Sequence, residues 1–265
     1  MSCPVCHGPT YIFDKATILG SHQASFVHCM SCGFMHIEEP VWLDDAYACA
    51  ITSSDTGLME RNHWFANVSS AIISVLFDAS GRFIDYGGGE GVYTSLMRQK
   101  GYNFFWYDKF AENLYSGPFE ADLTGSLSYE LLTAVELFEH LMNPKMGIAE
   151  MLRHSPNILF TTHLLPDAPP PIGKWWYYGL EHGQHVSFYS RKTLEYLAGI
   201  YNLSLTTNGR NLHLFSKKKL PEKIFRLLTS TPAVSLIKLF GKRPSLVSGE
   251  IQKEASKENK DANRP

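Results

Sequence analysis

Asp85-Tyr-Gly-Gly-Gly-Glu-Gly91 follows the short apolar run Phe83-Ile84 and is the most informative stretch of the chain. Glycines stand at alternating positions in it, namely Gly87, Gly89 and Gly91. Such glycines adopt positive φ angles and let the backbone lie directly against a ligand, where a Cβ would block the approach. A dinucleotide-binding turn has the spacing Gly-x-Gly-x-x-Gly, and counted from Gly87 its last position would be Val92. The spacing therefore argues against a dinucleotide and for another nucleotide-like ligand.

The bulk composition is that of a soluble globular protein. The 265 residues are 44% hydrophobic and 19% charged, with a formal net charge of −2, enough for one large α/β domain and a small appendage. This balance gives no global electrostatic case for nucleic acid binding. The N-terminus lacks the basic start and apolar core of a signal peptide, and no apolar run reaches the length of a membrane span. We therefore expect a cytoplasmic protein without a transmembrane segment.

Basic charge gathers at the C-terminal end. Residues 217–265 hold twelve Lys and Arg against five Asp and Glu, while the rest of the chain carries a net charge of −9. We expect residues 220–247 to form a helical extension that packs on the domain, on another subunit or at a membrane surface, which leaves a homodimer open. Residues 248–265 are polar with almost nothing to bury, which predicts a disordered tail.

Two cysteine pairs near the N-terminus predict a metal site. Cys3-x-x-Cys6 and Cys29-x-x-Cys32 are separated by a 22-residue loop that suits a small hairpin. Four thiolates satisfy tetrahedral Zn²⁺ and leave no open position for catalysis, so we expect a structural zinc site in a module over residues 1–40, with iron or an empty site as the alternative. Lys15 is the only Lys or Arg of this module, which argues against phosphate contacts and favours a partner or substrate-lid role.

Strand and helix patterns alternate through the middle of the chain. A helix over 58–77 is expected within a linking segment, 41–80, which precedes the main domain, 81–219. In that domain the expected strands are 82–85, 103–107, 131–137 and 157–162, the helices 92–100, 144–154 and 191–201, and a closing hairpin 203–207 with 212–216. This order predicts an α/β fold with a doubly wound, mostly parallel sheet and helices on both faces.

Polar residues follow the predicted strands at their carboxyl ends, where such sheets bind ligands. Asp108 comes after the second strand, and a carboxylate there can accept two hydrogen bonds from ribose hydroxyls. Asp122-Leu123 lies in the next connection. The stretch Glu136-Leu-Phe-Glu-His140 ends the following strand and is too polar for a purely structural strand end.

The ordered series of Asp85–Gly91, Asp108, Asp122 and Glu136–His140 resembles the class I S-adenosylmethionine (SAM) dependent methyltransferases over roughly residues 60–217. The resemblance implies a seven-stranded Rossmann-like sheet, SAM as cofactor, a glycine loop under the methionine portion and an acid that holds the ribose. The cofactor-binding residues it predicts are Asp85, Tyr86, Gly87, Gly89, Gly91, Asp108, Lys109, Asp122, Leu123, Glu136 and Phe138.

The N-terminal cysteines, together with Glu181-His-Gly-Gln-His-Val-Ser187, are similar to the zinc-containing sugar C-methyltransferases that act on nucleotide-linked keto sugars. His185 and Ser187 match that family's histidine and serine, whereas His182 replaces its tyrosine and Gln184 its glutamate. Those enzymes are also longer than this chain. The resemblance implies methyl transfer to a small molecule, with a sugar or nucleotide-sugar as one acceptor.

Methyl transfer to a hydroxyl, amine or enolisable carbon needs a base, and a histidine near neutral pKa suits the task. The catalytic candidates are His185, His140 and His182. The aromatic insertion over 166–179 is expected to form an acceptor wall. The alternative is a catalytically silent, methyltransferase-like zinc protein that acts as an interaction subunit. The acceptor, and C-, O- or N-methylation, stay open, as does methylation of RNA or protein.

Overall fold

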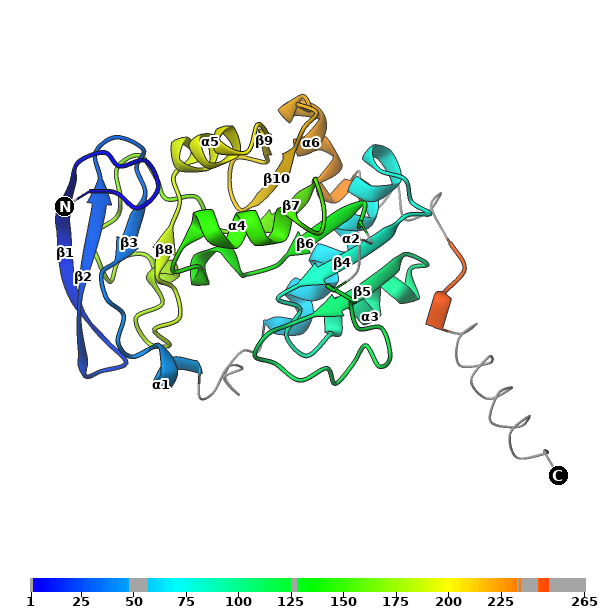
Figure 1. The fold of residues 1–265 in the computed structure, drawn as a ribbon, viewed down its shortest axis with the longest axis horizontal. Coiled ribbons are helices and arrows are strands. Elements are labelled where there is room, and N and C mark those ends of the chain that lie inside the picture. The colour runs from blue at the N-terminus through cyan, green and yellow to red at the C-terminus, as the bar shows by residue number, and fades with distance from the viewer. Residues whose placement is uncertain (1, 48–56, 125–127, 233, 235–242, 248–265) are drawn as a thin grey trace. The chain divides into compact units, whose positions relative to one another are not determined.

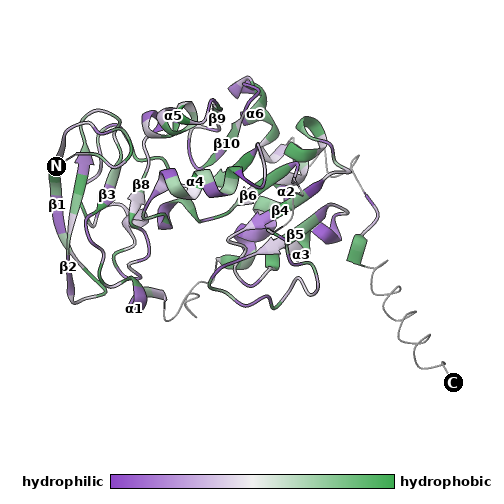
Figure 2. Ribbon diagram, viewed as in Figure 1, coloured by the Kyte–Doolittle hydropathy of each residue, from purple (hydrophilic) through white to green (hydrophobic). Residues whose placement is uncertain are grey.

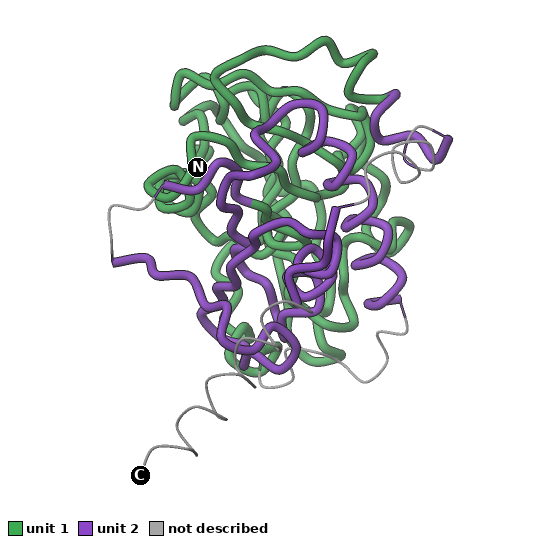
Figure 3. Tube along the Cα trace, turned by 90° about the vertical axis from the view of Figure 1, so that its right-hand side faces the viewer, with its two compact units in different colours: residues 1–55, 133–226 green, residues 56–132, 227–265 purple. Residues whose placement is uncertain are grey.

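The computed structural model describes residues 2–47, 57–124, 128–232, 234 and 243–247. It divides into two compact units, coloured separately in Figure 3. Unit 1 comprises residues 1–55 and 133–226, and unit 2 comprises residues 56–132 and 227–265. The predicted tail, 248–265, lies outside the described residues. The predicted domain boundaries stay predictions.

Unit 2 contains the expected helix–strand–helix–strand succession. Its elements are α2 (Leu58–Leu76), β4 (Arg82–Tyr86), α3 (Val92–Gln99) and β5 (Asn103–Tyr107). β4 and β5 pair in parallel, and the ring of Phe83 stacks on that of Phe104 at a centroid distance of 5.1 Å. The Tyr93 hydroxyl on α3 donates to Ser69 Oγ on α2 at 2.8 Å, so a buried polar contact joins the two helices. These elements position the glycine loop, residues 85–91, between β4 and α3.

Unit 1 supplies the antiparallel end of the main sheet and its helices. The elements are α4 (Pro144–Leu152), β7 (Ile158–Thr161), α5 (Arg191–Ile200), β9 (Ser204–Thr207), β10 (Leu212–Ser216) and α6 (Glu222–Leu228), the last of which continues past residue 226. β10 pairs antiparallel with both β7 and β9, as the predicted closing hairpin requires. Ser190 caps α5, since its Oγ accepts from Thr193 N at 3.1 Å. Strands buried on both faces, such as β7, are apolar almost throughout (Figure 2).

The main sheet has six strands in the order β5-β4-β6-β7-β10-β9, where β6 is Leu131–Ala134 (Figure 1). The mixed α/β fold is confirmed, but the prediction of seven strands is wrong for the described residues. Where a further strand would lie beside β5, the chain makes only a parallel bridge between Trp106 and Glu120. The surrounding residues 108–124 form turns that fold back over the glycine loop instead of a ladder.

A second, four-stranded sheet holds the N-terminal residues of unit 1, in the order β1-β2-β3-β8. β1 (Thr10–Ile18), β2 (His22–Cys29) and β3 (Met35–Ile37) form an antiparallel meander that contains the expected hairpin. β8 (Ser187–Phe188) comes from far along the chain and pairs with β3, with Met35 opposite Phe188. The N-terminal module is therefore completed by the segment that carries His185.

A helix of five residues, α1 (Leu43–Tyr47), follows this module. Trp42 precedes it and is buried in a cluster with Phe26, Tyr178 and Phe188. No helix in the described part of the chain combines the length and apolar character that crossing a bilayer requires.

Candidate functional site

The glycine loop of unit 2 has the backbone that its sequence predicts. Gly87, Gly89 and Gly91 have φ angles of +75°, +54° and +89°. A Cβ on Gly91 would lie 2.6 Å from Ser116 Oγ, whereas a Cβ on Gly89 would meet nothing within 4 Å. A side chain at position 91 would therefore clash with the protein itself. At Gly89 the neighbouring space is open, which leaves room for a ligand. This cradle fits the close approach that SAM requires.

Two carboxylates brace the loop. Asp85 is 1% exposed, and its Oδ2 accepts from Thr94 Oγ1 at 3.1 Å. Asp108 Oδ2 accepts from Gly89 N at 2.9 Å, and its Oδ1 accepts from the amides of Phe110 and Ala111. Asp108 is therefore held at the end of β5 against the loop, at the place where a ribose-binding acid is expected. Asp85 supports the loop from beneath.

A tryptophan that sequence reasoning missed also fixes the loop. Trp106 Nε1 donates to Gly89 O at 2.8 Å, and a Cβ on Gly88 would lie 2.8 Å from the Trp106 ring. The amides of Gly87 and Gly88 both donate to Tyr107 O. The alternation along β5 could have indicated that Trp106 faces inward, but not that it reaches Gly89.

The other predicted cofactor residues of unit 2 lie near the surface. The Tyr86 ring packs on Tyr107 at 4.9 Å, and Lys109 is exposed with its ammonium 5.3 Å from the Phe110 ring. Asp122 is exposed and its Oδ1 accepts from Thr124 N at 2.8 Å. Leu123 beside it is half-buried, so its apolar face is partly available.

In unit 1, two predicted cofactor residues follow β6, and they differ in their surroundings. Glu136 has a positive φ of 47°, and its Oε1 accepts from Thr161 Oγ1 at 2.7 Å. Phe138 is fully buried and stacks on Phe160 at 3.8 Å. Its ring belongs to the core, and its role at the cofactor stays a prediction.

The three predicted catalytic histidines lie together in unit 1. His185 stands 5.2 Å from His140 and 4.6 Å from His182, measured between ring centroids. With the neighbouring Glu139 they form what we call the histidine cluster. Glu139 and His140 belong to a 3₁₀ turn (Phe138–His140).

Hydrogen bonds indicate which ring nitrogen carries a proton in His185 and His182 of the cluster. His185 Nδ1 donates to Tyr177 O at 2.7 Å, which leaves the lone pair of the neutral ring on Nε2. His140 Nδ1 bonds to the Tyr47 hydroxyl at 2.9 Å. His182 Nδ1 accepts from Gln184 N at 3.2 Å, so its neutral ring carries the proton on Nε2. Of the three, His185 is oriented with a basic nitrogen away from its anchor.

Burial dominates the electrostatics of the cluster. Burial lowers the pKa of His140 to about 4, with a contribution from nearby His182. The pKa of His185 lies well below its ordinary value, for the same reason and because of His140. Burial, reinforced by the charge of Glu136, raises the pKa of Glu139 well above its ordinary value. Both histidines are therefore neutral near pH 7.

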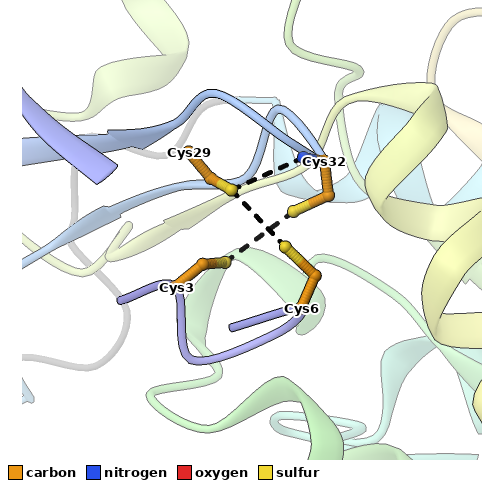
Figure 4. Close-up of side chains that lie close together, drawn as sticks. All are labelled: Cys3, Cys6, Cys29 and Cys32. Carbon is orange, nitrogen blue, oxygen red and sulfur yellow. Dashed lines mark hydrogen bonds between the residues drawn. The ribbon is translucent and has the colours of Figure 1, made fainter. Parts of the chain in front are cut away.

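The two cysteine pairs come together as predicted (Figure 4). Cys3 Sγ lies 3.7 Å from Cys32 Sγ, and Cys6 Sγ lies 3.5 Å from Cys29 Sγ. A tetrahedron with Zn–S bonds of about 2.3 Å has edges of about 3.8 Å. The amides of Ser31 and Cys32 point at Cys29 Sγ at 3.4 Å, as thiolate ligands require. This four-cysteine group fits zinc.

The N-terminal module, together with Trp42 and α1 directly after it, holds the segment that carries His185. Trp42 Nε1 donates to Gly183 O at 2.9 Å, and Gln184 Nε2 donates to Ala46 O at 2.9 Å. Ile37 N donates to Val186 O at 2.9 Å. The second knuckle is tied to α5, because Ser190 Oγ donates to Cys32 O at 2.8 Å. The four-cysteine group thereby supports the histidine cluster through the β3–β8 pairing.

The aromatic insertion is only partly open. Tyr177 and Tyr178 are fully buried, whereas Trp176 is 69% exposed. Tyr177 contacts the His185 ring at 4.7 Å and was not among the predicted site residues. The acceptor wall stays a prediction, and it now depends on Trp176.

The mixed sheet, with the glycine loop between β4 and α3, defines an α/β protein with a Rossmann-like fold. The family model for the methyltransferase domain matches residues 61–208, more than half of the chain, and the chain belongs to that family. No curated protein sequence matches it significantly.

Several of the solved structures to which this chain is similar are methyltransferases by title. The 1,6-didemethyltoxoflavin-N1-methyltransferase of Burkholderia thailandensis has 11% identity and a TM-score of 0.48, over 76% of this chain and 97% of that one. Magnesium protoporphyrin IX methyltransferase of Synechocystis PCC 6803 has 12% identity and a TM-score of 0.45, over 66% and 92%. TnmH has 17% identity and a TM-score of 0.46 over 68% of this chain, which spans 62% of TnmH. These likenesses are too weak to indicate a substrate.

Proposed function

We propose that this protein is a SAM-dependent methyltransferase that acts on a small-molecule acceptor. The observation that carries the proposal is the glycine loop, with positive φ at Gly87, Gly89 and Gly91 and open space beside Gly89. Membership of the methyltransferase-domain family supports it. Asp108 fits the ribose-binding acid, since it is fixed at the end of β5 by amide hydrogen bonds.

We assign the general base to His185. Bound SAM would supply a methyl group on its sulfonium sulfur. The acceptor's nucleophilic atom would bond to that methyl carbon as the carbon–sulfur bond breaks and S-adenosylhomocysteine leaves. His185 Nε2 takes the acceptor's proton, because Nδ1–H is already committed to Tyr177 O. Burial lowers the pKa of His185, so the ring is neutral near pH 7 and can accept a proton, but the same burial makes it a weaker base than a solvated histidine.

A sugar or nucleotide-sugar acceptor and a structural zinc ion complete the proposal. The sugar rests on the resemblance carried by the cysteine pairs, His185 and Ser187. The exposed Trp176 offers an aromatic face that suits a sugar ring. The zinc rests on the tetrahedral spacing of the four sulfurs.

Calorimetric titration with SAM tests the donor half of the proposal. Micromolar binding is expected, and absence of binding would favour the alternative, a silent interaction subunit. His185→Ala tests the base: turnover should fall by about 100-fold or more, measured as S-adenosylhomocysteine released with a panel of nucleotide-linked keto sugars. SAM affinity should not change. The exposed His63 on α2 provides the matched control, His63→Ala, which should keep full turnover.

A further inference from the structure

We propose that Glu139, His140 and His185 form a second metal site, for a divalent transition-metal ion, separate from the four-cysteine group. Each residue offers one ligand atom, and these atoms lie within 4.8 Å of one another. All three belong to unit 1. Bonds of about 2.0–2.2 Å to a common ion call for donors somewhat closer than this, so side-chain movements of about an ångström complete the site.

Glu139 is the residue whose surroundings favour a bound cation. It is 0% exposed, and neither carboxylate oxygen has a hydrogen-bond partner among the described residues. The hydroxyls of Thr162 and Tyr177 lie on this side and bond to each other at 3.0 Å, which uses one of their two protons. Both hydroxyls favour the ionised form of Glu139, but burial outweighs them and raises its pKa. A buried carboxylate without partners is costly, and nature resolves it by protonation, pairing or metal coordination. Two neutral imidazoles lie next to Glu139. A metal ion bound by all three side chains would compensate the buried carboxylate.

The two histidines are prepared as ligands. Metal-bound histidines in proteins usually bond through their other ring nitrogen to a carbonyl or another polar group, which fixes the ring. His185 has this arrangement with Tyr177 O and His140 with the Tyr47 hydroxyl, both through Nδ1. Nε2 is the nitrogen left on each ring. The low pKa of both rings keeps them neutral near pH 7, so each ring has one unprotonated nitrogen that can bind a metal ion.

The donor set selects the kind of ion. Two imidazoles and one carboxylate suit Zn²⁺, Fe²⁺ or a similar borderline ion, whereas Mg²⁺ and Ca²⁺ prefer oxygen ligands alone. Three protein ligands leave at least one position open. That is the arrangement of a site that binds a small molecule, in contrast to the closed four-cysteine group.

Metal binding would give His185 a different task from the free base assigned above. In the loaded protein its Nε2 holds the ion, and in the metal-free protein Nε2 takes the acceptor's proton. Loss of His185 lowers turnover in both cases, so activity cannot separate them. Metal content can, because it needs neither SAM nor an acceptor.

The experiment measures zinc in the untagged full chain by mass spectrometry, after saturation with Zn²⁺ and desalting. Two equivalents per chain are expected in the wild type, and one in Glu139→Gln and in His140→Asn, with affinity for the second equivalent lowered at least about 100-fold. Glu136→Gln makes the same charge change three residues away and should keep two. A wild type with one equivalent would overturn the site, as would Glu139→Gln and His140→Asn variants that both keep two.

Co²⁺ titration of the wild type gives an answer independent of any variant. The first equivalent should show the thiolate charge-transfer bands of a four-sulfur site, and the second should add d–d bands without new charge transfer. The same charge-transfer bands in Glu139→Gln show that its N-terminal module is folded. A second equivalent that is silent in the visible region would count against the proposal.

Discussion

The glycine loop and the histidine cluster differ in how their charged groups are satisfied. In the loop, Asp85 and Asp108 both accept hydrogen bonds from their own surroundings, and Asp108 alone accepts three from backbone amides. In the cluster, Glu139 is fully buried without a partner among the described residues. The loop is therefore complete before any ligand arrives. The cluster gains its missing interaction only from a proton or a bound ion.

The two regions also depend on different supports. The loop is built from residues 85–116 of unit 2, all close in sequence. The cluster draws on the N-terminal module and on α1, since Tyr47 of α1 bonds to His140 and β3 pairs with β8. Damage to one support should leave the other region intact, which three experiments can test.

Removing the proposed zinc ion should have the largest effect. Structural zinc contributes on the order of 10 kcal/mol to small metal-dependent folds. Cys29→Ser should lower zinc content by one equivalent and the melting temperature by more than about 10 °C, because the N-terminal sheet and the cluster lose their anchor. SAM affinity should stay within about threefold of wild type if unit 2 folds by itself. Met30→Ser, an exposed neighbour in the same knuckle, is the control. If Cys29→Ser lost SAM binding as well as zinc, the glycine loop would depend on the four-cysteine group, and the two regions would not have separate supports.

A buried histidine with partners provides the second test. His213 on β10 is fully buried, its Nε2 donates to Thr162 O at 2.9 Å and its Nδ1 contacts Thr207 Oγ1 at 2.8 Å. Burial lowers its pKa from 6.5 to about 4. The unfolded chain therefore takes up a proton first as pH falls, and stability is lost between pH 6.5 and 4.

The expected loss from His213 between pH 7 and pH 5 is about 2 kcal/mol. Urea unfolding of wild type and His213→Gln at both pH values measures it, as the difference between the two pH dependences. Parallel pH dependences would mean that His213 is not buried in the neutral form. In that case the contrast between His213, which is buried with hydrogen-bond partners, and Glu139, which is buried without them, would no longer hold.

The smallest expected effect distinguishes a glycine of the loop from a glycine of unit 1 with a similar backbone conformation. Gly91→Ala places a Cβ against Ser116 and holds alanine at φ +89°, so SAM affinity should fall at least about tenfold, or about 1.4 kcal/mol. Gly20→Ala imposes a similar φ of +72° with nothing within 4 Å, in unit 1, and should leave SAM affinity unchanged. Calorimetry measures both. Equal affinities in the two variants would show that the packing of Ser116 on the loop is unimportant.

Local patterns in the sequence were sufficient for the loop and for the four-cysteine group. Alternating glycines require only their own φ angles, and two Cys-x-x-Cys knuckles bring their sulfurs together through short turns. The boundaries of α2, α3 and β5 follow from local periodicity for the same reason. These features depend on residues a few positions apart.

Other features depend on which distant segments meet. The Tyr47–His140 bond joins residues 93 positions apart, and the isolation of Glu139 depends on every element packed around it. The missing seventh strand has the same cause, since residues around Glu120 make one bridge and then turn. Phe138 is predicted at the cofactor because it sits at a strand end, whereas its stacking on Phe160 in the core could not be read from the local sequence.

The pairing of β3 with β8 has a consequence for biosynthesis. The ribosome makes β3, Met35–Ile37, some 150 residues before Ser187–Phe188. During that interval the nascent chain presents β3 as an open edge, and an open edge invites pairing with other chains. The same holds for any fragment that ends before residue 187. The cysteine-bearing end of this protein is therefore a poor candidate for separate expression, although it comes first in the chain.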